Sequence, residues 1–214
     1  RPFEPHGNGN GHRLPLSAAQ AKPKISVDRH VVAVDVALFT IQDHSLKILL
    51  VKRAAAPFKG AWALPGGFVR VRDGTDQGED LDEAAHRELE EEPRLPRGAS
   101  ALEQLYTFGR AGRDPRTRVI TVAYYALVRP TLAPFVRAGD DAAEARWFPA
   151  SALPEPLAFD HAEILRVALD RIRGRIDYAP IAFDLVPETF TVAELRAVYE
   201  AVKGQGYDPK NFHR

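Results

Sequence analysis

Residues 64–95, LPGGFVRVRDGTDQGEDLDEAAHRELEEEPRL, contain the pattern that decides the fold. The helical stretch 81–92 carries Glu88, Glu91 and Glu92 at i, i+3 and i+4, which places three carboxylates on one helix face. Like charges held so close repel each other unless a cation intervenes. Grouped oxygen ligands suit Mg²⁺ or Mn²⁺, and such an ion can bridge the oxygens of a diphosphate. The stretch therefore predicts a diphosphate site, with a solvated acidic face as the alternative.

Two neighbouring features favour the site over the solvated face. Gly66 and Gly67 precede the helix, and glycines let a backbone approach a phosphate or a metal closely. Arg70 and Arg87 are close enough along the chain to neutralise part of the acidic face. We therefore expect Gly66 and Gly67 to contact a ligand.

The segment 87–92, RELEEE, resembles the core of the Nudix box, G-x5-E-x7-R-E-U-x-E-E-x-G-U, where U is aliphatic. Glu79 lies eight residues before Arg87, as the box requires. The resemblance implies a Nudix-type α/β/α sandwich with a mixed sheet, whose box forms a loop, a helix and a loop. It further implies that Glu88, Glu91 and Glu92 are metal ligands, that Glu88 and Glu91 are catalytic groups of vestigial or weak activity, and that Glu79 and Arg87 hold the loop.

The chain departs from the box in two places. Position 73, where the first glycine of the box belongs, is Asp, so Gly67 takes its place and the loop is about six residues longer. The box ends here in Pro93-Arg94, without the glycine that would adopt a left-handed conformation after the helix. Pro93 also disfavours the α conformation at Glu92, so we expect that carboxylate to diverge from the others. Both departures favour nucleotide binding over hydrolysis.

Outside this stretch, short apolar runs separated by turn residues predict an α/β domain. The expected strands are 31–41, 46–52, 102–108, 119–128 and 145–148, and an amphipathic helix is expected at 160–173. We place the Nudix-like domain at 25–155 and a helical unit at 156–214. The Gly- and Pro-rich segment 1–24 is expected to be a flexible arm.

The C-terminal unit has the signals of a helix-turn-helix. A capping box at 191–194 opens a helix with one apolar stripe, glycines at 204 and 206 make a turn, and Asp208-Pro209 opens a second helix. The second helix would enter the major groove. No wing is visible, and we expect the unit to be incomplete after residue 214. The expected DNA contacts are Lys210, Asn211, His213 and Arg214.

Charge does not by itself support DNA binding by this unit. Residues 159–214 carry eight basic and nine acidic side chains, whereas an autonomous DNA-binding domain is usually basic. A helical hairpin that only packs or dimerises therefore stays open as an alternative.

Several further segments resemble the NrtR family, the Nudix-related transcriptional regulators of NAD metabolism. They are 34–41, 51–53, 57–69, 106–116 and 158–165. The resemblance implies a winged-helix repressor of NAD biosynthesis and salvage genes that binds operator double-stranded DNA as a homodimer and senses ADP-ribose or a related effector. The alternative is a Mg²⁺-dependent ADP-ribose pyrophosphatase, with Mg²⁺ or Mn²⁺ on the glutamates.

Six further side chains are candidates near the expected pocket. Arg53 could pair with a phosphate or with Glu79. Arg113, Arg116 and Arg118 are suitably charged to meet a diphosphate, with a solvated loop as the alternative for each of them. Asp160 is expected to cap the helix that follows it. His161, at the start of that helix, is a candidate ligand contact or base, or else a core residue.

Composition limits the class of protein. The chain has 214 residues, with 29 basic and 29 acidic side chains and no cysteine, which excludes a disulfide scaffold and thiolate zinc sites. No apolar stretch reaches the ~20 residues that a membrane helix needs. We therefore expect a cytoplasmic protein with no membrane partner.

Overall fold

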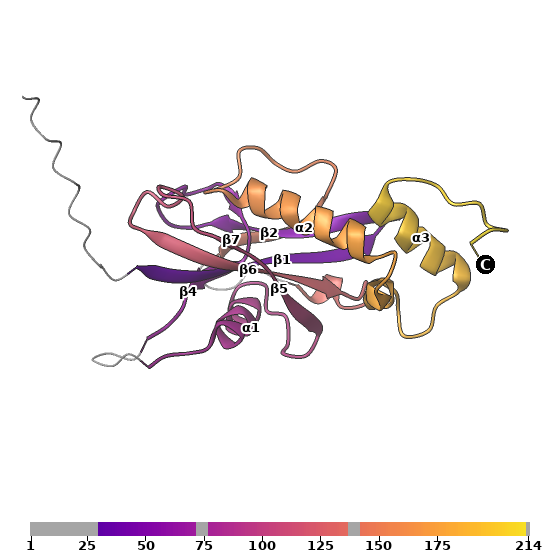
Figure 1. Cartoon of the computed structure of the whole chain (residues 1–214), viewed down its shortest axis with the longest axis horizontal. Coiled ribbons are helices and arrows are strands. Elements are labelled where there is room, and N and C mark those ends of the chain that lie inside the picture. The colour runs from indigo at the N-terminus through magenta and orange to yellow at the C-terminus, as the bar shows by residue number, and fades with distance from the viewer. Residues whose placement is uncertain (1–29, 72–76, 137–141, 213–214) are drawn as a thin grey trace, which may run out of the picture.

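A computed structural model describes residues 30–71, 77–136 and 142–212. A sheet forms the middle layer and helices lie on both of its faces, with α3 at one end of the molecule (Figure 1). The elements are β1 (Val31–Gln42), β2 (Ser45–Arg53), β3 (Trp62–Ala63), β4 (Gly66–Phe68), α1 (Leu81–Glu91), β5 (Ser100–Phe108), β6 (Val119–Val128), η1 (Ala133–Phe135), β7 (Ala142–Pro149), α2 (His161–Arg175), η2 (Pro180–Leu185) and α3 (Val192–Lys203). The expected strands and the helices expected at 81–92, at 160–173 and after Thr191 are confirmed, while β3, β4 and the two 3₁₀ helices were not predicted. The second helix expected after Asp208 is only a turn at 209–212 within the described residues.

The sheet is mixed, as the resemblance implies. Its main path runs β3-β2-β1-β6-β5, and β1 pairs in parallel with β6 while the other pairs are antiparallel. β1 changes partner along its length, because its last part pairs with β2 and its first part pairs with β4. β2 in turn pairs with β7. The strands therefore separate beside the first half of β1, where Asp35 faces Gly66.

Alternate residues of β1 belong to two different cores, because successive side chains of a strand point to opposite faces. Val34, Val36 and Leu38 pack with Ala84, Ala85 and Leu89 of α1. Ala37 and Phe39 belong to a second core with the buried faces of α2 and α3. These two cores make the α/β/α sandwich, and α3 shares the core of the sheet. The domain boundary near residue 155 stays a prediction; α2, which follows it, packs on the sheet.

The C-terminal helix-turn begins as expected. The Thr191 hydroxyl accepts from the Glu194 N–H, which completes the capping box of α3, and Gly204 ends the helix with φ 68°. The Asp208 carboxylate then accepts hydrogen bonds from the backbone N–H groups of Lys210 and Asn211. The described residues show only the first turn after this cap. The expected arm, residues 1–24, and the expected DNA contacts His213 and Arg214 lie outside the described residues.

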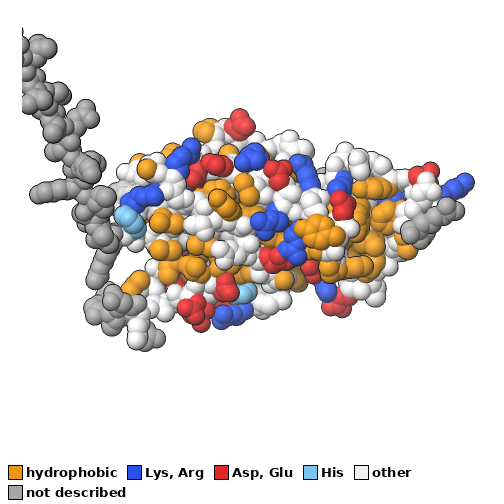
Figure 2. All heavy atoms as spheres, in the orientation of Figure 1, with side chains coloured by type: hydrophobic (Ala, Val, Ile, Leu, Met, Phe, Trp, Pro, Cys, Tyr) orange, Lys and Arg blue, Asp and Glu red, His pale blue; other side chains and the backbone are white. Residues whose placement is uncertain are grey.

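Hydrophobic side chains gather over the end of the molecule that carries α3 (Figure 2). Among the large exposed ones there, Phe183 and Phe190 lie with ring centroids 5.7 Å apart, and Val192 is 46% exposed. Within the described ranges, no helix is both long and apolar enough to cross a membrane.

The turn between β1 and β2 allows a simple test of backbone strain. Asp43 and His44 have φ values of 50° and 57°, as in the tight hairpin turns that favour Asn-Gly or Asp-Gly. Because His44 is exposed and a residue with a Cβ is strained in this region, His44→Gly should raise the free energy of unfolding by about 1 kcal/mol. Urea denaturation measures the change, and His44→Ala, which keeps the Cβ, should bring no gain.

Candidate functional site

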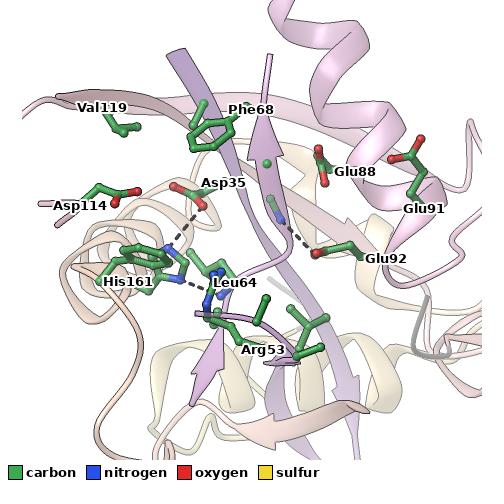
Figure 3. A pocket seen from close by; sticks show the side chains of 18 of the residues that line it. Asp35, Arg53, Leu64, Phe68, Glu88, Glu91, Glu92, Asp114, Val119 and His161 are labelled. Carbon is green, nitrogen blue, oxygen red and sulfur yellow. Dashed lines mark hydrogen bonds and ion pairs between the residues drawn. The ribbon is translucent and has the colours of Figure 1, made fainter. Parts of the chain in front are cut away.

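A pocket of about 850 Å³ opens where β1 leaves β2 for β4. It is lined by residues of β1, the glycine loop, α1, the loop before β6 and the start of α2. Glu88, Glu91 and Glu92 lie on one side of it, while Asp35, Asp114 and His161 lie on the other (Figure 3). The pocket therefore brings the expected box helix together with residues far away in the sequence.

Gly66 and Gly67 are needed because other atoms occupy the space of a side chain. A Cβ on Gly66 would lie 2.4 Å from the carbonyl oxygen of Val34, and a Cβ on Gly67 would lie 2.3 Å from Oε1 of Glu88. The Gly66 N–H donates to Glu92 Oε2 at 3.1 Å. The pair thus seats the end of the box helix against β1, and both glycines line the pocket.

Arginines hold the glutamates of α1. Arg87 donates two hydrogen bonds to Glu79, at 2.8 and 2.6 Å, and also reaches Glu88 and Glu91. Arg70 donates to Glu91 at 2.7 Å. Burial raises the pKa of Glu88 above its ordinary value, although the Arg87 guanidinium opposes this shift. The expected roles of Arg87 and Glu79 in holding the loop, and of both arginines in neutralising the acidic face, are confirmed.

The three expected metal ligands fit a divalent cation by chemistry but not by arrangement. Carboxylate oxygens are the donors that Mg²⁺ and Mn²⁺ prefer. Among the described residues, however, no group of three or more His, Asp or Glu side chains converges as a metal would need. The Glu91 carboxylate is held by two arginines and that of Glu92 by the glycine loop. As they are held here, the three carboxylates do not form a divalent metal site.

The end of the box helix corrects one expectation. Glu92, the cap residue after the last helical residue Glu91, is in the α region at φ −85° and ψ −61°, although Pro93 follows it. Arg94, which occupies the position of the box glycine, takes the left-handed conformation at φ 56°. The Leu95 N–H then donates to the carbonyl of Leu89 at 2.8 Å. The chain thus makes the turn of the box without its glycine.

A buried ion-pair network forms the opposite wall. Arg113 donates to both carboxylate oxygens of Asp160, at 2.9 and 2.6 Å, and contacts Asp35 at 3.4 Å. The exposed fractions of the Arg113 and Asp160 side chains are only 4% and 3%. Burial would raise the pKa of Asp35, but His161 and Arg113 outweigh it and lower the pKa. The expected cap is therefore wrong in one respect: the Asp160 carboxylate makes no capping bond, because it is bound to Arg113.

His161 is held between two elements. The Leu64 N–H donates to its Nδ1 at 2.8 Å, and its Nε2 faces Asp35 Oδ1 at 3.4 Å (Figure 3). Since Nδ1 accepts a hydrogen bond, it carries no proton, and the ring proton is on Nε2. The side chain is buried yet lines the pocket. His161 thus joins the start of α2 to the glycine loop and to β1.

Cations and aromatic rings alternate at the mouth of the pocket. The Arg53 guanidinium lies 4.8 Å from the Phe159 ring centroid, and Arg116 lies 5.7 Å from that ring and 4.9 Å from Phe68. Asp114 also binds Arg116, at 2.7 Å. Arg53 donates to the carbonyl of Pro57, and within the described ranges no carboxylate lies at ion-pair distance from it.

The structure brings most of the expected site residues together. Arg53, Gly66, Gly67, Arg113 and the three glutamates all line the pocket. Lys210 and Asn211 lie apart from it, exposed in the turn after α3. Arg116, a candidate from the sequence, also lines the pocket, whereas the sequence reasoning missed Asp35, Phe68 and Phe159. Only Asp35 had a visible signal, because it is an acid inside an otherwise apolar strand.

Two protein families match the chain. The NUDIX domain matches residues 29–168, and the NrtR DNA-binding winged helix domain matches residues 182–214. The first match covers the sheet, α1 and the first half of α2, and the second covers α3 and the turn after it.

Similar proteins fall into two functional classes. The ADPR responsive transcriptional repressor NtrR of Acinetobacter baylyi is 35% identical over 185 residues, which cover 86% of this chain and 71% of that protein. An ADP-ribose pyrophosphatase of Methanocaldococcus jannaschii is 40% identical over 131 residues, which cover 61% of this chain and 70% of that enzyme.

A solved structure extends the likeness to the whole fold. The crystal structure of Shewanella oneidensis NrtR complexed with a 27mer DNA superposes with a TM-score of 0.70 at 35% identity, and covers 86% of this chain and 80% of that chain. The chain therefore belongs to the Nudix family and, within it, to the NrtR proteins, which join a Nudix domain to a DNA-binding winged helix.

Proposed function

We propose that this protein is a transcriptional repressor of NAD biosynthesis and salvage genes that senses ADP-ribose in its Nudix pocket. One observation carries the proposal: the chain joins a pocket lined by arginines to a helix and capped turn that match a DNA-binding domain. The relatives from Acinetobacter and Shewanella, a repressor and a protein solved with DNA, support it.

The pocket suits an anionic diphosphate ligand. Arg53, Arg70 and Arg116 line it, and charge-assisted hydrogen bonds from guanidinium groups are the strongest that a diphosphate can receive. The glycine loop lets the ligand approach the backbone. We assign ligand binding to Arg53, Gly66, Gly67 and Arg113, the last through its place in the buried wall.

The decisive experiment measures operator binding and its response to the effector together. Fluorescence anisotropy of a duplex from upstream of NAD-biosynthesis genes should show binding that ADP-ribose changes at concentrations where NAD and NMN have less effect. A protein that binds none of these duplexes while it hydrolyses ADP-ribose briskly would contradict the repressor proposal.

Lys210 should contribute to DNA binding through phosphate contact. It is exposed at the start of the capped turn after α3, where a recognition helix would begin. Lys210→Ala should weaken binding to operator and unrelated duplexes alike, and lower the slope of log Kd against log salt by about one. Lys59→Ala, an exposed lysine in the loop between β2 and β3, is the control. Equal affinities for Lys210→Ala and wild type would exclude this turn from the DNA interface.

A second candidate function is ADP-ribose hydrolysis, which the Methanocaldococcus enzyme favours. Arginines already hold Glu88 and Glu91, the proposed catalytic groups, so we expect turnover to be weak. AMP release from ADP-ribose with Mg²⁺ or Mn²⁺ tests this expectation. Turnover within the typical enzyme range of ~1–10³ s⁻¹ would show that a metal rearranges the glutamates.

A repressor that reads a two-fold symmetric operator must present two recognition helices, so we propose a homodimer. The exposed apolar side chains Phe183, Phe190 and Val192 beside α3 support association. Light scattering measures the molar mass, and a monomer at the concentrations that bind DNA would contradict the proposal.

A further inference from the structure

Three consecutive residues at the start of α2 each contact a different part of the pocket. The Phe159 ring contacts the guanidinium groups of both Arg53 and Arg116. Asp160 accepts hydrogen bonds from Nε and Nη2 of Arg113. His161 accepts from the backbone of the glycine loop at Leu64. The segment 159–161 is therefore attached to Arg53, to the loop that carries Arg113 and Arg116, and to the glycine loop.

Phe159 is held in an unfavourable backbone conformation. Its φ is 52°, in the left-handed region, where a bulky residue persists only if its surroundings hold it there. Those surroundings are the two arginines and the Phe58 ring, whose centroid lies 4.9 Å from that of Phe159. An anionic diphosphate would bind the same arginines by stronger, charge-assisted bonds and so loosen their hold on the ring.

The other end of α2 is attached to the DNA-binding part. Arg173 donates to the carbonyl of Val202, and Lys203 Nζ donates back to the carbonyl of Arg173 at 3.3 Å. Lys203 also pairs with Asp177 at 2.6 Å. Lys203 is the last residue of α3, so these contacts lie at the point where the chain turns toward Lys210.

α2 is a continuous helix between these two attachments. It has 15 residues, which corresponds to about 22 Å, and its Ile164, Leu165 and Ile172 are fully buried against the sheet. A short, regular helix moves as a unit, because its backbone hydrogen bonds resist local change. A shift at residues 159–161 is therefore passed on to the end of α3.

From these contacts we infer that residues 159–161 sense the effector and that α2 carries the change to α3 and the DNA-binding turn. The inference rests on the proposed function and concerns the regulation of the same pocket. Asp160 and His161 are positioning residues in it. Lys203, which lies outside the pocket, connects the other end of α2 to α3.

The test compares the same substitution, Asp to Asn, at the start of α2 and within α2. Asp160→Asn weakens the buried pair with Arg113, whereas Asp170→Asn changes a 61% exposed carboxylate that pairs with Arg166 on α2. For each protein, the Kd of an operator duplex is measured with and without saturating ADP-ribose, and saturation is confirmed by calorimetry. The ratio of the two Kd values is the coupling, which for allosteric proteins is typically ~5- to 150-fold.

We expect Asp170→Asn to keep the coupling of wild type and Asp160→Asn to lose most of it. Lys203→Met should also lose most of the coupling, because it removes the contacts with Asp177 and the Arg173 carbonyl without touching the pocket. If Asp160→Asn does not fold, Lys203→Met still tests the inference. Wild-type coupling in Lys203→Met would overturn the inference while leaving the proposed function intact. Wild-type protein whose DNA binding ignores ADP-ribose would overturn both.

Discussion

Arg113→Ala should lower the free energy of unfolding by about 3–5 kcal/mol, because it leaves two buried carboxylates without their cation. The Asp160 side chain is 3% exposed and that of Asp35 is 10% exposed, so water cannot replace the guanidinium. Urea denaturation measures the loss. Arg110→Ala is the control, since Arg110 is 71% exposed and its partner Glu163 lies 3.9 Å away. A loss no larger than that of the control would show that the network does not stabilise the fold.

The same variant should respond to pH in a defined direction. In wild type, burial raises the pKa of Asp35, but His161 and Arg113 outweigh it and bring the pKa below 3.8. At pH values above the ordinary pKa range of a carboxyl group, this lowered pKa stabilises the fold. The stabilisation is lost as the pH falls through the lowered pKa. Without Arg113, burial is less opposed and the pKa rises. The difference in free energy of unfolding between wild type and Arg113→Ala should therefore be largest at neutral pH and decrease toward acid pH.

Gly66→Ala should weaken ligand binding and destabilise the fold. The added Cβ would lie 2.4 Å from the carbonyl oxygen of Val34 and 2.7 Å from Oδ1 of Asp35, so β4 must move away from β1. Overpacking of this kind costs about 1–3 kcal/mol. The movement also displaces the N–H that binds Glu92, so we expect at least a ~10-fold loss of ADP-ribose affinity, which corresponds to ~1.4 kcal/mol.

Gly174→Ala provides a control that should change the stability of the fold in the opposite direction. Gly174 lies inside α2, and a Cβ there meets no atom within 4 Å. Alanine is a better helix former, so this variant should gain about 0.5–1 kcal/mol. Calorimetry with ADP-ribose and thermal unfolding compare the two variants. If Gly66→Ala binds ADP-ribose as tightly as Gly174→Ala, the close approach of β4 to β1 is not needed for the pocket.

Local patterns were sufficient for the five longer strands, for α1, α2 and α3, and for the family. The contacts between Arg87 and Glu79, which lies before α1, were implied by the resemblance to the Nudix box. The i, i+3, i+4 placement of Glu88, Glu91 and Glu92 depends on helix geometry alone. The capping box at Thr191 and the cap at Asp208 could be predicted for the same reason, since each involves groups within three residues. Apolar runs likewise identified five strands, because a buried strand needs only its own side chains to be recognised.

The chain by itself thus determined a Nudix sandwich with a helix-turn at its end, together with the carboxylates and glycines of the box. Tertiary structure alone decided how those carboxylates are used and what lies opposite them. Arg113 and Asp160 are 47 residues apart in sequence, and Leu64 and His161 are 97 apart, so no local period could predict their contacts. Such pairs form only when β1, the glycine loop and α2 meet. Burial then removes water from the polar groups, so they bind each other instead.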